Sequence, residues 1–362
     1  MIVTSDARVS NHVLKDIRQL TMLDLQKELV SLGEPGFRAK QIYDWLWKKS
    51  VISFSKMSNL SLALREKLDG HFTIRALSQG RKQISADETI KNTFVLADGN
   101  SVEGVLIPTP GRMTACISSQ VGCSLSCKFC ATGYMERKRN LNADEIYDQV
   151  VMIDKQAREH YSTPLSNIVY MGMGEPLLNY ANVLKSIEHL TSEDGLHFSA
   201  KRITVSTAGI AKMIRRLGDE EVRFNLALSL HAANDTKRNQ IMPINEQNSL
   251  VSLRDALKHY FAKTRNPVTY EYIVFDKFND SLTDARELAD FCRHLPCKIN
   301  LIEYNPISNA SFLNAAADKI DVFAEFLRSR GIVCNVRRSR GKDIDAACGQ
   351  LALKEHPARL PL

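Results

Sequence analysis

Three cysteines stand close together in the chain at a spacing suited to an iron–sulfur cluster. Cys123, Cys127 and Cys130 form the pattern C-x-x-x-C-x-x-C. Three thiolates on one loop can each bind one iron of a [4Fe–4S] cluster, which leaves the fourth iron open to a substrate or cofactor. Zinc is the main alternative metal, but structural zinc sites normally have four ligands, and no second Cys or His pair follows nearby. Polar residues separate the three cysteines, which disfavours simple core packing, so the spacing predicts a cluster.

A second segment offers a contact for a ligand that carries an ammonium group. Residues 170–176 read YMGMGEP, with Gly174 and Glu175 just beyond a predicted strand. Glycine lets the backbone approach a bound molecule closely, and a glutamate carboxylate accepts hydrogen bonds from an ammonium group. Alone, this segment could be an ordinary turn, so its significance depends on its place one strand–helix unit after the cysteine loop.

The other five of the eight cysteines lie outside the cluster pattern. Cys116 precedes the cluster motif, and Cys348 lies among small residues that would permit an accessible loop. A lone cysteine is more often a core residue than a nucleophile, and the residues alone do not show whether these two meet. The remaining three, Cys292, Cys297 and Cys334, match no motif. Cys292 and Cys334 fall within apolar helix and strand patterns, so core packing is their default interpretation.

Strands and helices that could position these residues alternate from about residue 111 onwards. The predicted strands are 113–118, 167–171, 202–206, 224–230, 269–275, 298–304 and 333–337. The predicted helices are 143–159, 180–190, 210–217, 249–262, 282–294 and 320–330. Such alternation predicts parallel strands with right-handed crossovers, and no GxGxxG follows the first strand, which disfavours a doubly wound sheet. We therefore predict an α/β fold, a partial (β/α)6 barrel with its active site at the C-terminal ends of the strands.

The N-terminal part of the chain is predicted to form a small helical accessory domain and a β-hairpin. Helices are expected near 20–32, 38–49 and 61–68, and this unit could be a packing cap or an RNA-contacting domain. Asp98-Gly99 is a strong turn signal between two strand-like segments. The predicted boundaries are 1–80 for the accessory domain, 81–112 for a hairpin linker, 113–354 for the barrel and 355–362 for a tail.

Composition places the chain among ordinary globular proteins. Its 362 residues are 44% hydrophobic and 25% charged, and no stretch approaches the length of a membrane span. The first twenty or so residues are polar and do not read as a signal peptide, so we expect a cytoplasmic protein without a membrane partner. The formal charge of +7 is compatible with a polyanionic partner but does not establish one.

Six segments together resemble the RlmN/Cfr family of RNA methyltransferases, within the radical S-adenosylmethionine (SAM) superfamily. They are CISSQVGCSLSCKFCATG, YMGMGEPLLN, ITVSTAGI, LALSLHA, INLIEYNP and RSRGKDIDAACGQL, and the resemblance covers roughly residues 20–352. The resemblance implies a radical SAM barrel with a [4Fe–4S] cluster on Cys123, Cys127 and Cys130. It also implies SAM contacts from Gly174, Glu175, Ser206, Ser229, Leu230, His231 and Asn305.

The resemblance further implies that the enzyme methylates C2 of adenine and that Cys348 carries the methyl group. One SAM would methylate Cys348, and a second would supply a radical that removes hydrogen from the S-methyl group, so that two SAM are used per turnover. The carbon radical would add to the adenine, and Cys116 would then attack the Cys348 sulfur, forming a transient disulfide and releasing the RNA. Glu103 matches the family's proton acceptor, although Cys116 is an alternative and Glu103 could be a solvated hairpin residue.

The implied substrates are an adenine in the peptidyl-transferase region of 23S rRNA and an adenine beside the anticodon of tRNA. Flavodoxin or ferredoxin is the implied electron donor, and the protein is expected to be a monomer. Candidate RNA contacts are Arg137, Lys138, Arg139, Arg202, Arg215, Arg216, Arg337, Arg338 and Arg340. Methylation at C8, a radical SAM reaction on a peptide or metabolite, and a metal-stabilised RNA-binding module without catalysis remain alternatives.

Overall fold

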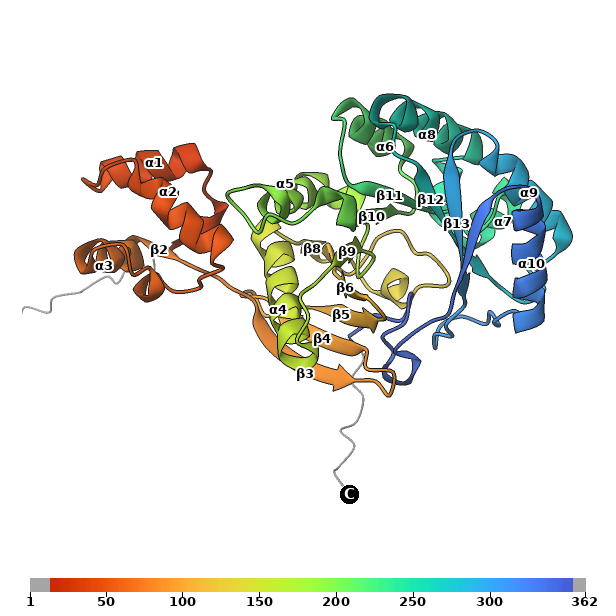
Figure 1. Ribbon diagram of the computed structural model, residues 1–362, viewed down its shortest axis with the longest axis horizontal. Helices are drawn as coiled ribbons and strands as arrows, with labels where there is room; N and C mark the ends of the chain where they lie inside the picture. Colours follow the sequence, from red (N-terminus) through yellow and green to blue (C-terminus); the bar gives the residue numbers. More distant parts are fainter. Residues whose placement is uncertain (1–13, 354–362) are drawn as a thin grey trace, which may run out of the picture. The chain divides into compact units, whose positions relative to one another are not determined.

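The computed structural model describes residues 14–353, which divide into two compact units (Figure 1). The smaller unit comprises the described residues up to Ala76 together with Glu193–Leu196. The larger unit comprises Leu77–Ser192 and the described residues from His197 onwards. The predicted tail, 355–362, lies outside the described residues. No helix in the described part of the chain is long and apolar enough to cross a membrane.

The smaller unit is helical. Its helices are α1 (Met22–Ser31), α2 (Arg38–Tyr43), which continues as a π-helical turn over Asp44–Lys48, and α3 (Leu62–His71). The side chain of Thr21 caps α1 by accepting a hydrogen bond from the Asp24 N–H at 3.1 Å, and Ser61 caps α3 in the same way. Two short strands, β1 (Lys15–Asp16) and β2 (Phe72–Thr73), pair in parallel and join the ends of the unit, a pairing that the sequence did not predict.

One ten-stranded sheet organises the larger unit. Its strands, in spatial order, are β14 (Val333–Arg337), β13 (Cys297–Glu303), β12 (Val268–Val274), β11 (Asn225–Ser229), β10 (Ile203–Thr207), β9 (Asn167–Tyr170), β6 (Arg112–Cys116), β5 (Ser101–Thr109), β4 (Ile90–Val95) and β3 (Ser78–Ile84). Within this sheet, β6 and the strands β9 to β14 pair in parallel with their neighbours, whereas β3, β4, β5 and β6 pair antiparallel. All seven residues of β12 are buried, as expected for a central parallel strand covered on both faces.

Helices form the crossovers between the parallel strands. They are α4 (Ala143–Tyr161), α5 (Tyr180–Thr191), α6 (Ala211–Asp219), α7 (Asp235–Ile241), α8 (Leu250–Thr264), α9 (Leu282–Cys292) and α10 (Ala317–Ser329). Figure 1 shows the sheet curved, with α6, α8, α9 and α10 along its outer side. Six strand-to-strand crossovers on an open, curved sheet confirm the predicted partial (β/α)6 barrel with a small N-terminal unit.

Strand β3 and helix α7 of the larger unit were not predicted from the sequence. Strand β3 extends the predicted hairpin to three antiparallel strands, although nearly all of its residues are exposed. A strand without an apolar alternation gives no periodic signal, so only its pairing with β4 reveals it. Helix α7 is polar over most of its length, and its sequence therefore lacks the apolar stripe of a surface helix.

Candidate active site

The three cysteines of the predicted cluster motif line one cavity at the C-terminal ends of the parallel strands. This first cavity has a volume of about 900 Å³. Its lining includes Cys123, Cys127, Cys130, Glu175, Ser206, Ser229, His231 and Cys348. The loops after β6, β9 and β11 and the end of β10 supply most of these side chains. The barrel therefore brings together residues that lie far apart in the sequence.

Backbone hydrogen bonds fix the cysteine loop between two short paired strands, β7 (Gln120–Val121) and β8 (Arg139–Asn140). The N–H of Cys130 donates to the Cys127 carbonyl at 3.2 Å, and the N–H of Gly133 donates to the Cys130 carbonyl at 2.9 Å. Among the described residues, no three His, Cys, Asp or Glu side chains are placed to hold one metal ion. A cluster makes a different demand, because each thiolate binds a separate iron.

Burial controls the ionisation of the three thiols. Burial raises the pKa of Cys127 well above its ordinary value, and the neighbouring Cys130 and Cys123 raise it further. Burial likewise raises the pKa of Cys123 to about 11. Thiolates crowded in a buried site need a compensating positive charge, which bound iron supplies. The donor set and its electrostatics therefore fit an iron–sulfur cluster.

Glu175 lies buried in the first cavity with backbone donors on its carboxylate. One oxygen accepts the Ala208 N–H at 2.7 Å, and the other accepts the Leu177 N–H at 3.0 Å. Burial raises the pKa of Glu175, and these hydrogen bonds oppose that shift. No ion pair joins Glu175 to a basic side chain in the described part of the chain. A buried carboxylate without a cation suits the ammonium group of an amino-acid ligand.

Gly174 is required by loop packing rather than by ligand approach alone. It has φ +92°, and a Cβ placed there would lie 2.4 Å from the Gln120 Cβ. Gln120 in turn accepts the Glu175 N–H through its side-chain oxygen at 2.8 Å. This hydrogen bond joins the cysteine loop to the loop that carries Gly174 and Glu175.

Some of the other predicted SAM contacts line the first cavity, and others lie outside its lining. Ser206 and Ser229 line the first cavity, with their hydroxyl oxygens 3.3 Å apart. His231 also lines it, and its Nδ1 accepts the Ile273 N–H at 3.0 Å, so the neutral ring carries its proton on Nε2. Burial lowers the pKa of His231 to about 3, which keeps the ring neutral. Leu230 is fully buried outside the cavity lining.

Asn305 connects the barrel to the Cys348 loop. Its side-chain N–H donates to the Cys348 carbonyl at 3.2 Å, while its buried Oδ1 has no protein partner. A buried acceptor without a donor is costly unless a ligand supplies one. Asn305 does not itself line the first cavity.

Cys348 lies on the boundary between the first cavity and a second one. The second cavity, of about 1080 Å³, is lined by Cys116, Cys348 and several arginines. Both cysteines are free thiols. Burial raises the pKa of Cys116 to about 12, with a smaller contribution from the adjacent Cys348, and Arg337 opposes this shift. Cys348 is therefore close enough to Cys116 to affect its ionisation.

Arg337 and Glu271 are site residues that sequence reasoning missed. Arg337 lines both cavities, and its guanidinium lies 3.4 Å from the Glu271 carboxylate, which lines the first. Cys348 as a whole residue is exposed, but desolvation of its thiol inside the site raises the pKa, and Arg337 has the largest opposing effect. Arg337 was predicted only as an RNA contact. The sequence did offer a signal for this pair. Arg337 ends the last strand, and Glu271 lies inside an otherwise apolar strand, where a charged residue needs a partner.

Glu103 lies outside the lining of both cavities. It is buried on β5, 3.5 Å from the Lys91 ammonium, and it accepts the Ala352 N–H at 2.9 Å. It is thus not a solvated hairpin residue. Glu103 instead contributes to the lining of a separate cavity, and its carboxylate binds the segment that follows Cys348.

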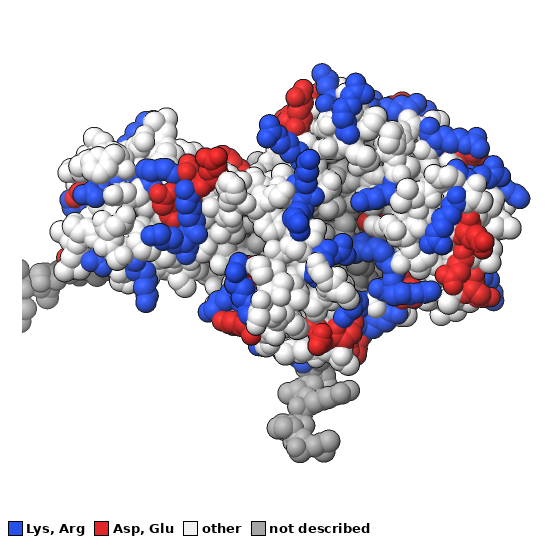
Figure 2. Space-filling model, in the orientation of Figure 1, with Lys and Arg blue, Asp and Glu red and all other residues white. Residues whose placement is uncertain are grey.

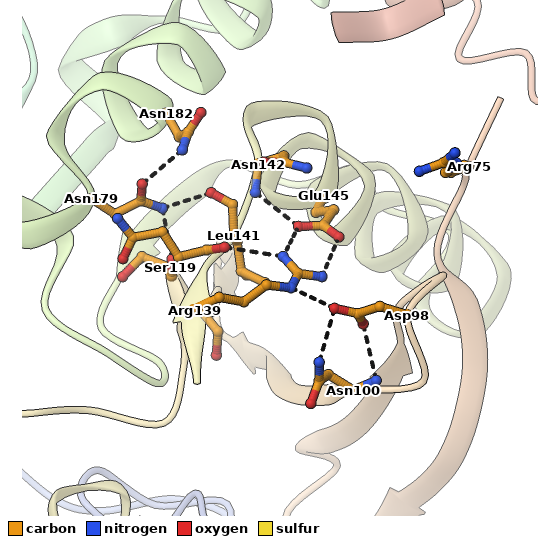
Figure 3. Close-up of polar contacts among 12 residues, drawn as sticks. Arg75, Asp98, Asn100, Ser119, Arg139, Leu141, Asn142, Glu145, Asn179 and Asn182 are labelled. Carbon is orange, nitrogen blue, oxygen red and sulfur yellow. Dashed lines mark hydrogen bonds and ion pairs between the residues drawn. The ribbon is translucent and has the colours of Figure 1, made fainter. Parts of the chain in front are cut away.

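Arg139 anchors the end of the cysteine loop. Figure 3 shows its guanidinium between Asp98 at the hairpin turn and Glu145 at the start of α4. Two parallel hydrogen bonds of 2.8 Å join it to Glu145. In the same view, the Asn179 side chain donates to the carbonyls of Ser119 and Leu141. Arg139 therefore stabilises the loop, although the sequence suggested it as an RNA contact.

Several other predicted RNA contacts are also paired with carboxylates. Arg338 pairs with Glu303, Arg340 with Asp87 and Arg216 with Glu220. By contrast, Arg137, Lys138, Arg202 and Arg215 are exposed. Figure 2 shows one face on which lysine and arginine side chains surround a hollow in the larger unit.

Comparison with known proteins gives a consistent result along the chain. Residues 15–74 match the ribosomal RNA large subunit methyltransferase N-terminal domain, and residues 117–292 match the radical SAM superfamily. A protein from Cytophaga hutchinsonii named "Probable dual-specificity RNA methyltransferase RlmN" is 62% identical over 341 residues, which cover 94% of this chain and 93% of that relative. The chain belongs to the RlmN family of radical SAM RNA methyltransferases.

Other relatives agree with this family membership. The dual-specificity RNA methyltransferase RlmN of Campylobacter fetus is 41% identical, over 91% of this chain and 97% of that protein. The crystal structure of a radical SAM methyltransferase from Sphaerobacter thermophilus matches with a TM-score of 0.88 and 41% identity, covering 93% of this chain and 99% of that one. The fold is therefore a radical SAM fold, and the family implies use of SAM and a [4Fe–4S] cluster.

Replacing Glu175 with glutamine is expected to weaken SAM binding. The neutral amide loses the charge that would attract the SAM ammonium group, so we expect affinity to fall about ten- to a hundredfold. Equilibrium binding of SAM to the reconstituted protein measures this. Glu188→Gln, at an exposed position on α5, is the matched control. Equal affinity in Glu175→Gln and the control would show that Glu175 does not contact the SAM ammonium group.

Proposed function

We propose that this enzyme methylates C2 of adenine in 23S rRNA and tRNA, with Cys348 as the carrier of the methyl group. The observation that supports this most strongly is the position of Cys348, which lines both cavities. One holds the cluster motif and most of the predicted SAM contacts, and the other holds Cys116. A thiol at this boundary can accept a methyl group on one side and meet an RNA base on the other.

In this proposal the residues of the first cavity bind the cofactors. Cys123, Cys127 and Cys130 would ligate the [4Fe–4S] cluster, which together with SAM supplies the radical that activates the methyl group. Glu175 would hold the SAM ammonium group, and Ser206, Ser229 and His231 offer hydroxyl and imidazole hydrogen bonds around it. Gly174 shapes the loop, while Leu230 and Asn305 would contribute from behind the lining. Two SAM are used per turnover, one of them to methylate Cys348.

The second cavity would hold the target adenine and the releasing thiol. Once the methylene carbon on Cys348 has joined the base, one electron, which the oxidised cluster would take back, and the C2 proton must leave before the Cys116 thiolate attacks the Cys348 sulfur. A disulfide forms, the sulfur–carbon bond breaks, and its electron pair stays on the carbon, which takes a proton to become a methyl group. Arg337 stabilises both thiolates by its positive charge. Reduction of the disulfide prepares the enzyme for another turnover.

The group that removes the C2 proton remains a prediction with two candidates. Cys116 lines the second cavity. Glu103, which the family resemblance favours, lies outside it and is bound to the Ala352 N–H. A role for Glu103 therefore requires the segment after Cys348 to move away from its carboxylate.

RNA would approach the second cavity over its basic rim. Arg112, Arg337, Arg338 and Arg340 all contribute to the lining of this cavity. Base methylation inside a cavity requires an unstacked base, and phosphate contacts supply much of the affinity. We propose as substrates an adenine in the peptidyl-transferase region and one beside the tRNA anticodon, with a monomeric enzyme and flavodoxin or ferredoxin as the electron donor.

Methyl transfer to defined RNAs tests this proposal. The anaerobically reconstituted enzyme is incubated with methyl-labelled SAM, reductant, and either 23S rRNA or tRNA that lacks the modification. We expect label in both RNAs and none in fully modified RNA used as the control. SAM cleavage without label in either RNA would contradict the substrate assignment.

A further inference from the structure

A fully buried arginine lies on α7, directly behind the cysteine loop. The side chain of Arg238 is 0% exposed. Its guanidinium donates to the carbonyls of Leu230 at 3.0 Å and Ala208 at 2.6 Å, and to the Asn245 side-chain oxygen at 2.6 Å. It also donates to the Ser229 carbonyl at 3.1 Å. These acceptors take four hydrogen bonds from its five N–H groups, and all of them are neutral.

The positive charge of Arg238 has no matching carboxylate. No ion pair joins it to an Asp or Glu among the residues that the structure describes. Asp235 acts on it from a greater distance, but the Asp235 carboxylate accepts hydrogen bonds from Asn245 and the Leu250 N–H. Burial lowers the pKa of Arg238 to about 10, so the group stays charged at neutral pH. A buried charge without a counter-charge is strongly unfavourable, which indicates that its partner is an anion bound nearby.

The cysteine loop, which contacts the end of α7, is a place for such an anion. The Lys128 N–H, within the cluster motif, donates to the Ile241 carbonyl at the end of α7 at 3.0 Å. Ile241 and Met242 belong to the apolar cluster against which the three motif cysteines pack. Arg238 is also the one nearby positive charge that lowers the pKa of Cys127. Apolar side chains at the end of α7 therefore separate the guanidinium from the thiols, and such a low-dielectric layer screens the charge little.

We propose that Arg238 is the fixed counter-charge of the cluster held by Cys123, Cys127 and Cys130, and that it raises the reduction potential of that cluster. This inference rests on the proposed ligation of the cluster by these cysteines. Reduction adds one negative charge to the cluster. A nearby positive charge stabilises the reduced form more than the oxidised form, so it makes the cluster easier to reduce.

A purely structural role for Arg238 would be to tie together the ends of β10 and β11. Four variants separate the two roles. Arg238→Met removes the charge and the hydrogen bonds, and Arg238→Gln removes the charge but keeps an amide donor. Arg238→Lys keeps the charge with fewer hydrogen bonds. Asn245→Ala removes one hydrogen-bond partner while leaving the guanidinium in place.

The test is a dithionite titration of each reconstituted protein, with the reduced cluster followed by electron paramagnetic resonance and iron content measured beside it. At the wild-type midpoint, we expect the ratio of reduced to oxidised cluster to fall at least tenfold in Arg238→Met, equivalent to a potential about 59 mV more negative. Arg238→Gln should shift in the same direction. Arg238→Lys and Asn245→Ala should keep the wild-type potential.

Each other outcome gives a distinct answer. If the uncharged variants match the wild-type potential, the counter-charge role is wrong while the proposed function stands. If both uncharged variants fail to retain iron but Arg238→Lys and Asn245→Ala retain it, the charge is needed for the cluster itself. Loss of iron in all four variants would show a structural role and overturn the inference. A wild-type protein that binds no cluster would overturn the proposed ligation and this inference with it.

Discussion

Replacing Cys348 with alanine is expected to abolish methyl transfer to RNA while SAM cleavage continues. The three cluster cysteines and Glu175 are unchanged in this variant, so the first cavity can still bind its cofactors. Without the thiol at the boundary of the two cavities, no atom carries the methyl group to the base. We expect a loss of at least about a thousandfold, on the scale seen when a nucleophile is removed. Formation of labelled RNA and of 5′-deoxyadenosine measures the two activities separately.

Cys297→Ala provides a matched control for the loss of a thiol. Cys297 is a partly exposed free cysteine at the start of β13 and lines neither cavity. This variant should retain both activities. RNA methylation by Cys348→Ala at a rate near that of the control would contradict the proposed role of Cys348.

Replacing Cys116 with alanine is expected to trap RNA on the enzyme. In the proposed sequence Cys116 breaks the bond between the Cys348 sulfur and the methylene carbon, so its removal stops the reaction at the covalent adduct. Denaturing gel electrophoresis with labelled RNA should show a shifted band that the double variant Cys116→Ala, Cys348→Ala lacks. Normal product release by Cys116→Ala without any adduct would rule out this role for Cys116.

The release step should also depend on pH. Burial, with a contribution from Cys348, raises the pKa of Cys116 to about 12, so the thiol is protonated at neutral pH. Below its pKa, the thiolate fraction rises about tenfold per pH unit, so release in the wild type should accelerate between roughly pH 7 and pH 9. Single-turnover decay of the adduct measures this rate. A rate that stays flat or falls with pH would contradict attack by the Cys116 thiolate.

Strong local signals in the sequence predicted most of the barrel. The seven parallel strands and six helices were found close to their predicted ranges, because buried strands such as β12 are continuous apolar runs and the amphipathic helices have a clear period. The spacing of Cys123, Cys127 and Cys130 likewise indicated one loop, since short separations force the three side chains together. That Cys116 and Cys348 share a cavity depends on how β6 and the segment after β14 meet, which no local pattern encodes.

The buried charged residues of the site were not predicted from the sequence. Arg238 sits in a polar helix that resembles a solvated surface segment, yet its side chain is fully buried. Glu271 interrupts an otherwise apolar strand, and its partner Arg337 appeared to be part of a basic surface run. Ion pairs and buried charges are formed by residues distant in the chain, so their pairing emerges only from the fold. Glu103 was assigned from family resemblance, and only the structure shows its bond to Ala352.

The most direct test of the account is to follow one methyl group through Cys348. The reconstituted enzyme is first loaded with methyl-labelled SAM without RNA, freed of small molecules, and then given unlabelled SAM, reductant and substrate RNA for a single turnover. Mass spectrometry of the Cys348 peptide and of the RNA nucleosides locates the label. We expect the label to leave Cys348 and appear on adenine C2. An unlabelled methyl group on the adenine, with label still on Cys348, would contradict the account, and label on C8 would contradict the C2 assignment alone.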